Sequence, residues 1–501
     1  MSATAPATAP RTDTLPQFGQ ILGHPAPLWM LFMSEFWERF AFYGIRWALV
    51  LYIVAQFHAG SATGQADANR TYGAYLALVY AGAIFGGYIA DKILGYQRSI
   101  LTGAVFMAAG LFMISLPDSN IFKLGLATVI VGNGMFKPII STIVGKLYAA
   151  GDARRDSGFT IFYMGINAGA FLAPIVTQWL AQAVFGTNAA PAYKVVFIAS
   201  GVGMLVSLVW FYFGRVQLKG IGAPPPELAG PQPILYVALG ALVMIPVYYG
   251  LLAVGAQVLQ VVLTILFIVL AVMLVVEGVR EGQVARDKVI AMMIIFTFNI
   301  LFWMFFEQAG SSFTFLADEI VNRNLGSFVF PTAWFQSVNS VAIILLAPVI
   351  AWIWIRMGTA NPSIPRKFGL GLVFNGLAFL LLMYALSSLV GPDNKIPFWT
   401  LVAVYFIQSV GELCLSPIGL SMVTKLAPVR LVGFGMGGWF LSTGIGDNLS
   451  GIFASAVSGE KGMTTASALS GYTFGFWTLV GAGVILFLAA PVVTRFMHGV
   501  K

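Results

Sequence analysis

The sequence predicts an all-α membrane protein of two six-helix bundles, with an extra helix pair between them. Of its 501 residues, 58% are hydrophobic and only 9% are charged, whereas a soluble domain carries about 25% charged residues. Fourteen apolar segments are long enough to cross a bilayer, which takes about 20 residues each. We therefore expect 14 transmembrane helices in a six, two and six arrangement.

The predicted segments follow one another along the chain. Residues 1–27 are rich in Ala, Pro and Thr without a signal-peptide pattern, so we expect a disordered cytoplasmic tail. The N-terminal bundle, residues 28–215, contains the predicted spans 28–57, 72–92, 98–116, 120–149, 157–185 and 193–215. The linker, residues 216–285, contains the nearly uncharged spans 232–252 and 256–281, which favour a lipid-facing scaffold. The C-terminal bundle, residues 286–498, contains the predicted spans 286–318, 330–357, 367–390, 395–427, 433–458 and 471–498.

The distribution of basic residues predicts the orientation of the chain. With the N-terminus inside, the cytoplasmic segments hold roughly three times as many Lys and Arg residues as the outside loops. We therefore expect a multi-pass protein of the cytoplasmic (inner) membrane with both termini in the cytoplasm. Because the basic residues are scattered among membrane loops, the net charge of +8 does not indicate nucleic-acid binding. Cys414 is the single cysteine, and the three histidines lack metal-ligand spacing, so we expect no disulfide, metal or cofactor.

The first predicted span carries four charged residues, Glu35, Glu38, Arg39 and Arg46. Each charge at membrane depth costs about 2.5–3.5 kcal/mol on insertion scales, so their presence calls for a reason. At about 100° per residue, Glu35, Arg39 and Arg46 share one stripe of the helix. This stripe must face protein or water, because lipid offers no partner for a charge.

Two further spans of the N-terminal bundle carry polar residues at membrane depth. Lys137 precedes Pro138, which loosens the helix, and we expect this lysine to pair with Glu35 or Glu38. In the fifth span, Gly165 and Gly169 form a small-residue face suited to close helix packing. Asn167 lies between these two glycines. It either bonds to another helix or contacts a ligand.

The C-terminal bundle contributes acids and no base at membrane depth. Glu307 lies among aromatic residues. Two interpretations are open: a carboxyl group that gains and loses a proton, or a structural carboxyl group that stays protonated. Glu412 lies beside a second proline break, and for Asp447 a gate contact and a structural hydrogen bond are equally plausible. A cavity between the bundles would be basic on one wall and acidic on the other, which suits a zwitterion such as a short peptide. Polar and aromatic residues available to line it are Tyr43, Tyr80, Trp303, Asn339 and Trp439.

Four motifs resemble the signatures of the proton-dependent oligopeptide transporters, the POT or PTR family of the major facilitator superfamily. They are Glu35-x-x-Glu38-Arg39-Phe40 with Tyr43-Gly44, Gly87-x-x-x-Asp91-Lys92-x-x-Gly95, Phe162-Tyr163-x-x-Ile166-Asn167-x-Gly169, and Gly411-Glu412-x-x-x-Ser416-Pro417-x-Gly419. The resemblance covers residues 28–498 and includes the extra helix pair typical of bacterial members. One departure is Phe42, where many members carry a tyrosine.

The resemblance implies a monomeric symporter, not an enzyme, that moves protons with di- and tripeptides into the cell by alternating access. By position, the residues that look like substrate contacts are Arg39, Tyr43, Arg46, Tyr80, Lys137, Asn167, Trp303, Asn339, Glu412 and Trp439. Those that resemble proton-coupling acids are Glu35, Glu38 and Glu307. A carrier for another anion or zwitterion, such as nitrate or a drug-like molecule, is the main alternative. A membrane enzyme or a channel fits the pattern less well, because intramembrane histidines are absent from the sequence and opposed charges suit an occluding site.

Overall fold

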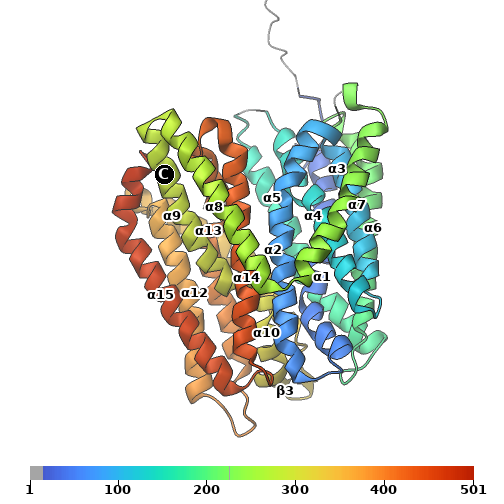
Figure 1. Ribbon diagram of the computed structural model, residues 1–501, viewed down its shortest axis with the longest axis vertical. Coiled ribbons are helices and arrows are strands. Elements are labelled where there is room, and N and C mark those ends of the chain that lie inside the picture. The colour runs from blue at the N-terminus through green and yellow to red at the C-terminus, as the bar shows by residue number, and fades with distance from the viewer. Residues whose placement is uncertain (1–14, 150, 225, 501) are drawn as a thin grey trace, which may run out of the picture.

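The computed structural model describes residues 15–149, 151–224 and 226–500. Within these ranges 14 long helices run side by side along the long axis of the molecule (Figure 1). Twelve of the helices found there are long and apolar enough to cross a membrane. The other two are α3 (Tyr96–Met113), which packs on α4, and α14 (Val432–Ser458), which packs on α2 and is largely buried. The expected multi-pass fold is confirmed.

The elements follow the predicted six, two and six order. The remaining helices of the N-terminal bundle are α1 (Ala26–Phe57), α2 (Gln65–Ile89), α4 (Ser119–Lys146), α5 (Arg155–Trp179) and α6 (Tyr193–Gly214). The pair in the linker is α7 (Gln232–Ala253) and α8 (Ala256–Glu281). The remaining helices of the C-terminal bundle are α9 (Gln283–Phe306), α10 (Ser312–Phe315), α11 (Trp334–Met357), α12 (Ile364–Ser388), α13 (Phe398–Leu426) and α15 (Thr465–Phe496).

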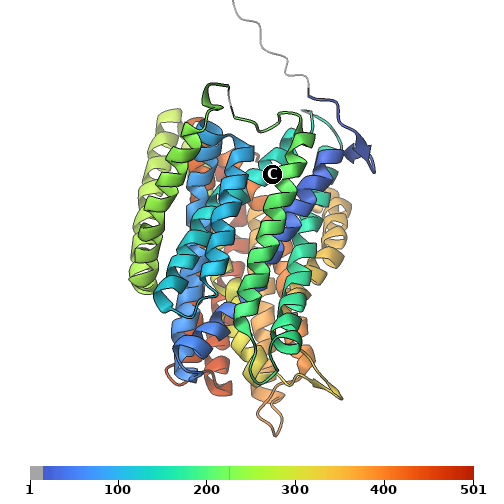
Figure 2. The same cartoon turned by 90° about the vertical axis from the view of Figure 1, so that its right-hand side faces the viewer.

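The described part of the N-terminal segment is folded, which corrects the expectation of disorder over residues 1–27. β1 (Gln20–Ile21) and β2 (His24–Pro25) form a short antiparallel hairpin directly before α1. The hairpin is held to the bundle by the bond between the His24 ring and the Tyr148 hydroxyl, 2.8 Å long. It lies at the end of the helices that also carries the C-terminus (Figure 2). Residues 1–14 of the predicted tail lie outside the described residues.

The predicted span 286–318 matches one candidate membrane span, Gln283–Ile320, but its helix is not continuous. α9 ends at Phe306, a 3-10 turn follows over Glu307–Gly310, and the short α10 begins after Ser311. Ser311 has backbone angles of φ −127° and ψ −102°, which no helix permits. The break places Glu307 at a helix end facing the other bundle. A second hairpin, β3 (Asn324–Leu325) with β4 (Phe328–Val329), lies in the loop that follows.

The extra helices do not form a unit of their own. α7 packs mainly on α4 of the N-terminal bundle, whereas α8 packs on α9 and α14 of the C-terminal bundle. Figure 1 shows the two helices diverging in front of α2 and α14. Asn448 donates hydrogen bonds to the Ala256 carbonyl and the Gln260 side chain, 2.8 and 2.9 Å long, which attach α8 to α14. The many exposed apolar side chains of the pair agree with a lipid-facing scaffold.

The expected close approach through the small face of α5 is confirmed. A Cβ on Gly169 would lie 2.4 Å from the Phe36 carbonyl oxygen of α1, and one on Gly165 would lie 2.9 Å from the Phe32 ring. The backbone of α5 therefore rests against the stretch of α1 that carries Glu35 and Arg39. Because these two glycines have no side chain, the backbones of α5 and α1 can approach each other closely.

We expect Gly169→Ala to lower the free energy of unfolding by about 1–3 kcal/mol, the usual effect of overpacking. The new methyl group meets backbone, which cannot rotate away as a side chain can. A thermal melt of the purified protein in detergent measures the effect. Gly240→Ala in α7 is the matched control, because a Cβ there meets nothing within 4 Å. Equal melting of the two variants would contradict the account.

Candidate functional site

The charges of α1 form a buried cluster around Arg39. Its Nε lies 2.9 Å from Glu35 Oε1 and 2.5 Å from Glu38 Oε2, and all three side chains are at most 4% exposed. Asn133 of α4 donates a hydrogen bond of 3.3 Å to Glu38. Two carboxylates thus surround one guanidinium, which stays charged at neutral pH. The cluster lies within α1 and is joined to α4 through Asn133. A proton on either acid changes its balance of charge.

Lys137 has a different partner from the one expected. Its Nζ lies 4.0 Å from the centre of the Tyr80 ring and 5.8 Å from that of Phe42. Among the described residues no carboxylate lies within 4 Å of this nitrogen, so the predicted ion pair with Glu35 or Glu38 is wrong. The lysine rests on aromatic faces, a contact worth about 2 kcal/mol or more when desolvated. Within the described ranges its ammonium has no hydrogen-bond acceptor, so its hydrogens are available to a ligand.

Glu307 is not the lone carboxylate that the sequence suggests. Its Oε2 lies 2.5 Å from Nη2 of Arg46, and the two side chains are 10% and 12% exposed. Arg46 Nε also donates a 2.9 Å hydrogen bond to the Tyr72 hydroxyl, and its guanidinium lies 5.7 Å from the centre of the Tyr43 ring. The ion pair joins α1 of one bundle to the break after α9 of the other. It is therefore sensitive to any relative motion of the bundles.

Further polar contacts between the bundles lie toward the end of the molecule that carries the loops 58–64 and 459–464. Gln65 bonds to Glu319 at 2.6 Å, Asn69 to Ser458 at 2.9 Å, and Gln178 accepts from the Ala333 backbone at 2.7 Å. This end of the molecule, named the outer end here, is closed by these bonds.

A cavity of about 620 Å³ lies between the bundles toward the opposite end, where the chain termini lie. Tyr163 lines it from α5, and Trp354, Lys367 and Glu412 line it from the C-terminal bundle. Asn339 donates hydrogen bonds to Glu412 Oε2 at 3.1 Å and to Ser409 at 2.9 Å, which orient the acid. The described part of the molecule is thus closed at one end and leaves a cavity toward the other.

Three of the residues that line this cavity were not predicted as site residues from the sequence. Tyr163 was noted only as part of a motif, Lys367 was placed at a predicted helix start, and Trp354 carried no signal. The Lys367 ammonium lies 4.9 Å from the centre of the Trp354 ring. A lysine one turn inside an apolar span is the signal that was available for this pair.

The other predicted site residues differ in their exposure and in their contacts. Tyr43 and Tyr80 lie at mid-helix and Trp303 lies in the last turn of α9, and all three are partly exposed. Trp303 donates a 3.0 Å hydrogen bond to Asn299. Asn167 is 6% exposed and donates to the Tyr163 carbonyl of its own helix. Its contact with a ligand stays a prediction. Trp439 is 6% exposed and packs against two phenylalanine rings of its own bundle. Its role as a cavity wall stays a prediction.

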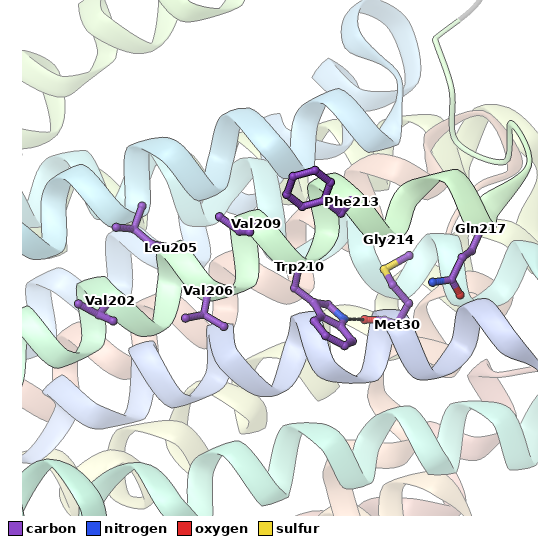
Figure 3. Close-up of a pocket in the computed structure, with 9 residues that line it drawn as sticks. All are labelled: Met30, Val202, Leu205, Val206, Val209, Trp210, Phe213, Gly214 and Gln217. Atoms are coloured by element: carbon purple, nitrogen blue, oxygen red, sulfur yellow. Dashed lines mark hydrogen bonds between the residues drawn. The ribbon is translucent and has the colours of Figure 1, made fainter.

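A second, apolar groove lies away from the cavity between the bundles. It has a volume of about 540 Å³ and runs along the outer faces of α1 and α6. In Figure 3, Trp210 donates its indole hydrogen to the Met30 carbonyl, and valine, leucine and phenylalanine side chains line the remainder. None of the predicted site residues lines this groove. A groove of this composition on an outward face suits lipid tails.

Comparison with known proteins identifies the family. The profile of the POT family matches residues 97–468. The chain belongs to the POT family. A member from Yersinia enterocolitica, the peptide transporter YePEPT, is 34% identical over 470 residues, covering 88% of this chain and 89% of that protein. Dipeptide and tripeptide permease A of Salmonella typhimurium is 33% identical, covering 94% and 93%.

A solved POT structure matches the whole fold. It shows a variant of the peptide transporter POT in complex with alafosfalin, with a TM-score of 0.82 and 33% identity, covering 97% of this chain and 98% of that one. The resemblance inferred from the four sequence motifs is thereby confirmed. The major facilitator architecture of this POT family member follows from the same match.

Proposed function

We propose that this protein is a proton-coupled symporter that imports di- and tripeptides across the cytoplasmic membrane by alternating access. The ion pair between Arg46 and Glu307 carries the proposal, because it joins the bundles and ties a titratable acid to a basic group. The names of the relatives, peptide transporter and dipeptide and tripeptide permease, support the substrate class. The ligand of the solved relative, alafosfalin, supports it as well.

The peptide is held between the basic and acidic walls. Its carboxylate binds to Arg46 and Lys137, whose ammonium has free hydrogens, and its amino group binds to Glu412 beside Asn339. Charge-assisted hydrogen bonds of this kind contribute about 1.5–3 kcal/mol each. The aromatic walls Tyr43, Tyr80, Trp303 and Trp439 add contact area without selecting one side chain, and Asn167 contacts the peptide backbone. Arg39 acts through its cluster with Glu35 and Glu38.

Proton coupling follows from competition for Arg46. Glu307 as a carboxylate occupies this guanidinium, whereas protonated Glu307 releases it to the peptide carboxylate. Loss of the proton toward the cytoplasm restores the pair and displaces the peptide. Each charge that moves inward is driven by about 2.3 kcal/mol per 100 mV. Glu35 and Glu38 respond to protons in the same cycle.

The proposal assigns a role to each part of the chain. Residues 28–215 and 286–498 are the two bundles that rock about the site, and the linker 216–285 spans between them as a scaffold. The larger number of basic residues on the predicted inner loops supports an orientation with both termini in the cytoplasm. The protein functions as a monomer, since one chain supplies both the basic and the acidic residues of the proposed site.

The test is uptake of labelled dialanine into liposomes under an imposed inward proton gradient. We expect accumulation that an uncoupler abolishes and that unlabelled dialanine inhibits. Free alanine and nitrate are the controls, and neither should compete. Absence of uptake under any gradient would refute the peptide assignment, and competition by nitrate would favour an anion carrier.

A further inference from the structure

Asp447 is a buried acid that the proposed cycle does not use. It lies near the middle of α14 and is 0% exposed. It occupies the face of α14 packed on α2, where a Cβ on Gly444 would lie 2.8 Å from the Ala77 carbonyl oxygen and one on Gly451 2.5 Å from that of Asn69. The two helix backbones are thus in near contact on either side of this carboxyl group.

Neither oxygen of Asp447 has a hydrogen-bond partner within the described residues. The ionisable groups that interact with its charge come from four elements. They are Arg46 of α1, Tyr72 and Tyr80 of α2, Lys137 of α4 and Glu307 after α9. In the described ranges α8, α13 and α15, which also contact α14, add no group to this set, and no base lies within 4 Å of the carboxyl group.

This environment selects the neutral form of the carboxyl group. An ionised carboxylate without donors in a dry interface is strongly unfavourable, and such a group takes up a proton instead. When α2 and α14 separate, water reaches the group and stabilises its charge. Packing of the two helices is therefore linked to uptake of one proton, and separation to its release.

We propose that Asp447 is a proton-binding site of the outer gate formed by α2 and α14, occupied when the helices are packed and vacant when they part. The site goes beyond the proposed function, which assigns the transported proton to Glu307 with Glu35 and Glu38. It rests on alternating access, because the gate must open for the proton to leave. Binding of a proton to Asp447 does not require a bound peptide.

Distance measurements between spin labels test the proposal without substrate. The labels are placed at Thr63→Cys and Glu460→Cys, two exposed positions at the outer ends of α2 and α14, in a Cys414→Ser background. A Glu307→Gln background removes the acid to which the transported proton is assigned. We expect the ratio of open to closed molecules to rise with pH, by up to about tenfold per pH unit for one linked proton. Asp447→Asn should abolish this rise.

Two further variants keep the test decisive. Asp447→Glu restores a carboxyl group and should restore the rise with pH, and Asp447→Ser replaces the asparagine variant if that protein does not fold. Glu319→Gln is the matched control, since Glu319 is an acid of the outer end bonded to Gln65, and the rise should persist there. An unchanged rise in Asp447→Asn or Asp447→Ser would overturn the proposal. A single distance at every pH would also overturn it, whatever dialanine uptake shows.

Discussion

Glu307→Gln is expected to abolish proton-driven accumulation of dialanine and to leave counterflow intact. One proton moved per peptide supports about 50-fold accumulation at 100 mV, since each charge contributes about 2.3 kcal/mol and each 1.4 kcal/mol is tenfold. Glutamine keeps a hydrogen-bond acceptor for Arg46 but exchanges no proton. The accumulation ratio of the variant should therefore fall to about one, while exchange of labelled for unlabelled peptide continues.

The measurement is the steady-state ratio of internal to external dialanine in liposomes with an imposed potential and proton gradient. Glu319→Gln serves as the control, because it removes an acid of the outer end that bonds to Gln65 and does not contact Arg46. We expect this control to accumulate peptide as the unmodified protein does. Normal driven uptake by Glu307→Gln, with normal counterflow, would show that the coupling proton binds elsewhere.

Glu412→Gln is expected to weaken binding of dialanine by about 10-fold to 100-fold, the loss of one charge-assisted hydrogen bond. The structure orients this carboxylate toward the cavity with Asn339 and Ser409. The partner assigned to it is the amino group of the peptide. N-acetyl-dialanine has no ammonium group, so it should bind weakly to the unmodified protein and about equally weakly to the variant.

Competition against labelled uptake by the two compounds measures this difference. The informative quantity is the ratio of their inhibition constants, which a general loss of folding or transport does not change. The ratio should fall from about 10–100 in the unmodified protein to about one in Glu412→Gln. A ratio that stays high in the variant would place the ammonium site on another residue.

Helix count, order and the intramembrane charges were predictable from the sequence. A run of about 20 apolar residues is a local property of the chain. A charged residue within such a run is visible in the sequence, and its insertion into the membrane has a known free-energy cost. The small face at Gly165 and Gly169 was predictable for the same reason, since helical periodicity defines faces. The two details of the fold that were not predicted have separate causes. The break at Glu307 depends on the backbone angles of Ser311, and the hairpin before α1 depends on a contact with Tyr148.

The residues that bear charge at membrane depth, and the bundle on which each lies, follow from the sequence alone. Their partners depend on the tertiary structure. It pairs Arg46 with Glu307, which lies 261 positions away in the chain, places Lys137 on the Tyr80 ring, and leaves Asp447 without a donor among the described residues. The physical reason is that periodicity directs a side chain toward an interface, whereas its partner is set by how two separately formed bundles meet.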